Sequence, residues 1–174
     1  MRCRIYHKMT TKEMLFVTCL YLIAFIAVIY FTRATSRRVA GSVAGGLAAS
    51  MFGLGAIALC EALGWWHIPF APTVFFLPVF YVGLAITLAP IYLITWRLTR
   101  RFGLRGLVIF VGIVAAIGPP RDYGYATMFP EWMVFGPGVA PILADSATYV
   151  GAVVIGHAVM RLVSGASGDD RLAR

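Results

Sequence analysis

The sequence predicts an all-α fold, a polytopic bundle of about five transmembrane helices. Hydrophobic residues make up 60% of the 174 residues and charged residues only 13%, and the apolar residues are collected in long uninterrupted runs. A soluble domain of this size keeps a polar shell, because roughly a third of the surface of its unfolded chain stays in contact with water. Lipid is therefore the expected solvent for most of the side chains.

The chain divides into one transmembrane domain, 1–163, and a polar C-terminal tail, 164–174. A helix needs about 20 apolar residues to cross the hydrocarbon layer. Five runs approach that length, and they lie near 14–31, 39–60, 73–96, 106–120 and 139–160. The fourth run reaches only about 22 Å at 1.5 Å per residue, so whether it and the first run cross completely is left open.

The second and third runs have features of their own. Small residues are frequent in the second run, where Gly41 and Gly45 are four apart and Gly46 follows. This spacing lets helices approach closely, so the glycine-rich face could join a homo-oligomer or a larger complex. The third run contains Pro78 and Pro90, which predict a bent helix.

The segment 119–138, between the last two runs, is predicted to be an irregular loop. Its prolines exclude a continuous helix across the segment, and its aromatic side chains suit the lipid headgroup layer. The prolines are Pro119, Pro120, Pro130 and Pro137, and the aromatic residues include Tyr123, Tyr125, Phe129 and Trp132.

The basic residues predict which end of the bundle faces the cytoplasm. Loops 33–38 and 97–105 and the C-terminal end hold ten arginines, whereas the two opposite loops hold only Arg121. By the positive-inside rule the arginine-rich loops are cytoplasmic in a multi-pass protein of the cell membrane. Five crossings would then place the N-terminus outside, which its own four basic residues oppose, so the side of the N-terminus stays open.

The same charges do not indicate nucleic acid, although the formal net charge is +8. They lie in short clusters between apolar runs and form no basic face. Nucleotide-binding and metal-binding motifs are absent from the sequence, so no cofactor and no metal are predicted. Membrane lipid is the partner that the composition predicts.

Four of the seven acidic residues gather at the end opposite the arginines, and three of them, Glu61, Asp122 and Asp145, are candidate catalytic residues. Asp145 lies inside an apolar run, where a carboxylate costs about 2.5–3.5 kcal/mol at mid-helix and therefore faces protein or water. The hydroxyl of Tyr149, one helical turn away, could hold this carboxylate. Alternatively, Asp145 lies within two turns of the interface and merely acts as a cap or pairs with Arg121.

Aromatic and polar side chains at the same end form a candidate substrate-binding set. Its members are Trp65, Trp66, His67, Arg121, Tyr123, Glu131, Trp132 and Tyr149. Each has a simpler interpretation: Arg121 and Asp122 would form a local ion pair, and Glu61 and Glu131 would lie at the water interface. His157 lies about 120° around its helix from Asp145, so the two share no face, and it is predicted to be a packed or snorkelling histidine.

Three functions are compatible with this pattern. The first is a small intramembrane enzyme that acts on an isoprenoid- or lipid-like substrate by acid or acid-base catalysis. The second is a proton- or cation-coupled transporter, or its membrane subunit, in which Asp145 binds the coupling ion. The third is a non-catalytic scaffold that assembles through the glycine-rich second run.

Overall fold

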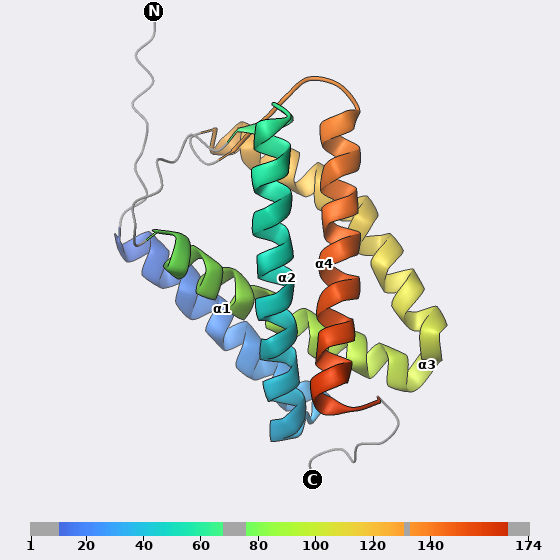
Figure 1. Ribbon diagram of the computed structural model, residues 1–174. Coiled ribbons are helices and arrows are strands. Elements are labelled where there is room, and N and C mark those ends of the chain that lie inside the picture. Colours follow the sequence, from blue (N-terminus) through green and yellow to red (C-terminus); the bar gives the residue numbers. More distant parts are fainter. Residues whose placement is uncertain (1–10, 68–75, 131–132, 167–174) are drawn as a thin grey trace, which may run out of the picture.

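The computed structural model describes residues 11–67, 76–130 and 133–166, with the side chains of 11–18 and 76–80 excepted. This part of the chain is almost entirely helical (Figure 1). The helices are α1 (Thr11–Thr32), α2 (Ser36–Ala62), α3 (Phe76–Met128) and α4 (Ala140–Ser164), and the short strands are β1 (Trp66–His67) and β2 (Val134–Phe135). The all-α prediction is confirmed.

Three helical segments are long and apolar enough to cross a membrane: Ser36–Ala62, Tyr81–Met128 and Ala140–Ser164. The described part of α1, Cys19–Thr32, is a shorter apolar helix. Many large apolar side chains remain exposed on the surface of the bundle, for example Leu162 at 84%. These exposed apolar side chains are compatible with a membrane environment, in which lipid would cover them.

The predicted third and fourth runs are both part of α3, which turns sharply at Gly103. Gly103 has φ 64° and ψ −153°, outside helical geometry, and a positive φ is accessible to glycine because it has no Cβ. The resulting arms, 76–102 and 104–128, diverge from this elbow (Figure 1). α3 packs against both α2 and α4. α1 packs along α3.

Glycines bring α2 into backbone contact with both of its neighbours. A Cβ placed on Gly45 would lie 2.4 Å from the carbonyl oxygen of Gly156 in α4. A Cβ on Gly46 would lie 2.4 Å from the carbonyl oxygen of Ala85 in α3. Helix backbones approach this closely only where side chains are absent. The glycine-rich face that suggested an oligomer is thus covered by the chain's own helices.

The prediction of an irregular segment beginning at 119 is wrong, since α3 continues through Pro119 and Pro120 to Met128. Proline has no N–H, so Pro119 cannot bond the carbonyl four residues earlier, that of Ala115. In the fold, the Ser146 hydroxyl of α4 donates to that carbonyl at 3.1 Å. A hydroxyl from a neighbouring helix thus replaces a missing backbone donor, which lets a membrane helix continue through proline.

The arginine-rich end of the bundle is closed by Arg38, which is fully buried. Its guanidinium donates to the carbonyls of Gly165 and Ala166, at 2.9 and 2.6 Å, just beyond the end of α4. It also lies over the Trp96 ring, with the guanidinium carbon 5.2 Å from the ring centroid. A cation at a helix C-terminus satisfies carbonyls that have no helical partner. The residues around 33–38 and the end of α4 therefore meet at one end.

Candidate functional site

The opposite end of the bundle is closed by the two short strands. β1 and β2 pair antiparallel, with Trp66 opposite Phe135 and His67 opposite Val134. The Gly136 amide also donates to the Trp65 carbonyl at 2.7 Å. This pairing holds the segment after α2 against the segment before α4. Residues 65–67 and 134–136 therefore lie at the same end of the bundle.

Asp145 lies in the second turn of α4, beneath the paired strands β1 and β2, and is only 5% exposed. Its Oδ2 atom is buried and has no hydrogen-bond partner among the described residues. A buried polar oxygen without a partner is unusual in a folded protein. The prediction that Asp145 faces protein and not lipid is confirmed. The alternative in which Arg121 pairs with it is wrong, because the Arg121 guanidinium bonds Asp122 and Tyr149.

Aromatic side chains of β1, β2 and α3 pack together near this part of α4. The Tyr123 ring stacks on Phe135 with centroids 4.0 Å apart, and Trp66 meets the Phe135 ring edge-on at 6.1 Å. Trp66 is 3% exposed, and its indole N–H points to the carbonyl of Pro141, one turn before Asp145, at 3.5 Å. We call Asp145, Tyr123, Trp66, Phe135 and Cys60 the Asp145 site.

Within the part of the chain that the structure describes, two polar groups of the Asp145 site have no hydrogen-bond partner. One is Asp145 Oδ2 and the other is the Tyr123 hydroxyl, which is also buried. Asp145 is close enough to act electrostatically on both Tyr123 and the buried thiol of Cys60. A ligand that offers both a donor and an acceptor, such as an alcohol, could satisfy the two orphaned groups together. Aromatic faces could also stabilise positive charge near the carboxylate.

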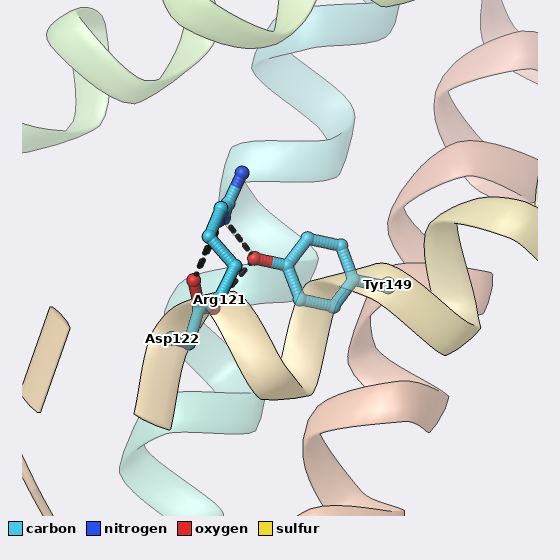
Figure 2. A network of polar contacts seen from close by, with 3 residues as sticks. All are labelled: Arg121, Asp122 and Tyr149. Atoms are coloured by element: carbon cyan, nitrogen blue, oxygen red, sulfur yellow. Dashed lines mark hydrogen bonds and ion pairs between the residues drawn. The ribbon is translucent and has the colours of Figure 1, made fainter. Parts of the chain in front are cut away.

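A second polar group, Arg121, Asp122 and Tyr149, joins the end of α3 to α4, and Figure 2 shows its three side chains. Arg121 Nη2 lies 2.8 Å from Asp122 Oδ1, so the predicted local ion pair is confirmed. The Tyr149 hydroxyl donates to Asp122 Oδ2 at 2.5 Å and accepts from Arg121 Nη2. The prediction that Tyr149 holds Asp145 is therefore wrong, because its hydroxyl proton is used by Asp122.

Tyr149 reaches this position because α3 has a glycine where the ring passes. A Cβ on Gly118 would lie 2.3 Å from the Tyr149 ring. The ring therefore packs against the bare backbone of α3, one turn from Arg121. Sequence spacing along α4 relates Tyr149 only to residues of its own helix, whereas the contact depends on how closely α3 and α4 approach.

Glu61 and His67 form a separate, exposed pair at the same end of the bundle. Glu61 Oε1 lies 3.2 Å from His67 Nδ1, and the side chains are 44% and 66% exposed respectively. The described residues include no hydrogen bond between Glu61 and Asp145. The exposure of Glu61 supports its interpretation as a residue at the water interface.

The other predicted site residues have mixed outcomes. Trp65 contributes its backbone carbonyl, which accepts from the Gly136 amide beside the paired strands. Glu131 and Trp132 lie outside the described residues, so their predicted roles remain predictions. His157 is 4% exposed with Nδ1 2.9 Å from the Thr95 hydroxyl, which confirms a packed histidine.

Phe135 and Cys60 belong to the site but were not identified from sequence. Both are apolar residues at the ends of apolar segments, where they resemble ordinary packing residues. Only the strand pairing places Phe135 between Trp66 and Tyr123. An alternation of apolar and polar residues around 133–136 would have been the available signal, but a two-residue strand is too short to show it.

No protein-family model matches the chain, and neither the curated proteins nor the solved structures include a significant match to it.

Proposed function

We propose that the chain is an integral membrane protein with five crossing segments, formed by α1, α2, the two arms of α3, and α4. The three long apolar segments support this arrangement, and the turn at Gly103 divides the longest of them, 48 residues, into two lengths suited to one crossing each. Arginines at one end and carboxylates at the other support an orientation with loops 33–38 and 97–105 in the cytoplasm.

At the end opposite the arginines, the protein acts as a small enzyme on an isoprenoid- or lipid-like substrate by acid catalysis. The single observation that supports this function is the buried Asp145 carboxyl near the rings of Trp66, Tyr123 and Phe135, whose Oδ2 has no hydrogen-bond partner among the described residues. A carboxyl group that is kept from water and has no ion pair with a described residue is suited to hold a proton and deliver it.

The chemistry is a proton-initiated rearrangement. Asp145 in its acid form donates its proton to a carbon–carbon double bond of the substrate, and a carbocation forms at the neighbouring carbon. The electron-rich ring faces of Trp66 and Tyr123 stabilise this charge. The cation then loses a proton from an adjacent carbon to the Asp145 carboxylate, which restores the acid. Substrate and product are isomers, so the reaction needs no oxidant, reductant or cofactor.

The test uses host cells whose own copy of the gene is deleted and that express wild type, Asp145→Asn or Glu61→Gln from an introduced copy. Lipid extracts of these cells are compared. Wild type should convert one lipid-soluble species into an isomer, which mass spectrometry coupled to chromatography resolves. Asp145→Asn should reduce the product at least about 100-fold, the usual contribution of a positioned acid. Glu61→Gln, which changes the exposed carboxylate paired with His67, should retain it. Undiminished product in Asp145→Asn membranes, at equal protein level, would exclude this function.

A proton- or cation-coupled transporter is the second candidate, and the same Asp145 supports it. Intramembrane carboxylates commonly bind the coupling ion, and Pro90 in the first arm of α3 gives that arm a point at which it could bend. Proteoliposomes distinguish the two: Asp145-dependent proton flux with an unchanged lipid extract favours transport.

The third candidate, a scaffold that assembles through the glycines of α2, has less support. Gly41, Gly45 and Gly46 already contact α3 and α4 of the same chain. A partner would have to use another surface, such as the exposed apolar residues of α1.

A further inference from the structure

The elbow of α3, at the arginine-rich end, is tightly packed at its corner. Gly106 is buried there, and a Cβ on it would lie 2.9 Å from the Phe102 Cβ and 3.0 Å from the Leu98 carbonyl oxygen. The second arm therefore begins in direct contact with the end of the first, at the corner marked by the α3 label in Figure 1. The arms then separate.

A groove of about 640 Å³ runs along this corner. Its walls are mainly apolar, and several wall residues are strongly exposed, with Ile109 at 63% and Ile113 at 50%. The lining residues are Leu98, Phe102, Arg105, Gly106, Ile109, Phe110 and Ile113. A long, open, apolar groove on the outside of a membrane bundle suits a flexible hydrocarbon chain.

Positive charge is concentrated beside the groove. Arg105 is part of its wall, and the Arg101 guanidinium lies over the ring of Phe102, another wall residue, with 5.2 Å between its central carbon and the ring centroid. Arg97 and Arg100 lie within the same nine residues, 97–105, and the sequence has no acidic residue between Glu61 and Asp122. The planar guanidinium group matches the geometry of a phosphate.

We propose that the elbow of α3 is a binding site for one anionic phospholipid. Its acyl chain lies in the groove against Ile109 and Ile113, and its phosphate lies at Arg101 and Arg105. Basic pockets at the cytoplasmic side of membrane helices bind anionic headgroups in this way. The Asp145 site is at the other end of the bundle, so a result that excludes the proposed catalysis would not exclude this lipid site.

The test is native mass spectrometry of the purified full chain in detergent, titrated with dioleoyl phosphatidylglycerol or dioleoyl phosphatidylcholine. Wild type should bind one phosphatidylglycerol more tightly than phosphatidylcholine. Each arginine near a membrane surface contributes about fivefold in affinity for anionic lipid, so Arg101→Gln with Arg105→Gln should weaken phosphatidylglycerol binding about 25-fold. Arg37→Gln, an exposed arginine at the same end, is the matched control and should change little.

A second pair of variants tests the groove itself. Ile109→Trp places a bulky side chain in the groove and should weaken the binding of both lipids. Val108→Trp makes the same change at a neighbouring residue that is 61% exposed but does not line the groove, and it should leave binding intact. Equal affinity of wild type for the two lipids, or equal effects of the two tryptophan variants, would overturn the proposal.

Discussion

Replacing Gly45 by alanine should force α2 and α4 apart. The added Cβ would lie 2.4 Å from the carbonyl oxygen of Gly156, whereas ordinary contact begins at 3.4 Å, so the helices must separate locally by about 1 Å. Neither helix moves freely, because α2 is also held against α3, where a Cβ on Gly46 would lie 2.4 Å from the Ala85 carbonyl oxygen. Strain of this kind in a packed core costs about 1–3 kcal/mol of unfolding free energy.

Gly55→Ala is the matched control, since Gly55 lies in the same helix and a Cβ there would meet nothing within 4 Å. The control should keep or raise the stability, because alanine favours a helix over glycine by about 0.5–1 kcal/mol. The assay is unfolding of each purified variant in mixed micelles with increasing sodium dodecyl sulfate, followed by tryptophan fluorescence. If Gly45→Ala proved as stable as Gly55→Ala, the close approach of α2 to α4 described above would be incorrect.

Two further predictions concern the proline segment and the orientation in the membrane. Ser146→Ala should lower the unfolding free energy by about 1–3 kcal/mol, because it leaves the Ala115 carbonyl without a donor. Thr148→Ala removes a hydroxyl that is bonded within its own helix and should cost less in the same assay. Equal losses of stability in the two variants would contradict the role of Ser146 in bridging α4 to α3. In a chain whose native cysteines are replaced, an impermeant maleimide added to intact cells should label His67→Cys but should label Leu104→Cys only after permeabilisation. Labelling of both variants from one side would refute the proposed orientation.

The helices themselves could be predicted from sequence because each one depends mainly on the composition of its own segment. Uninterrupted apolar runs require helical backbone in lipid, where every N–H and C=O must be bonded within the segment. The runs near 39–60 and 139–160 accordingly correspond to α2 and α4. The continuation of α3 through Pro119 could not be predicted this way, because its missing bond is replaced by Ser146, a residue of another helix.

The candidate site was predicted in part for the same reason. The burial of Asp145 follows from the energetic cost of exposing a carboxylate to lipid, and the Arg121–Asp122 pair follows from adjacency. The partner of Tyr149 does not follow from spacing along α4. It depends on the close approach of α3, which Gly118 permits.

By itself, the sequence determined that this chain is helical and that lipid is its expected solvent, because hydrophobicity is a property of each residue. It also indicated that ten arginines and four of the seven acidic residues gather at opposite ends. Tertiary structure decided which polar groups find partners. Asp122 has Arg121 and Tyr149, whereas Asp145 Oδ2 has none among the described residues. Hydrogen bonds act over about 3 Å, so their pairing depends on how closely helices that are distant in sequence approach each other.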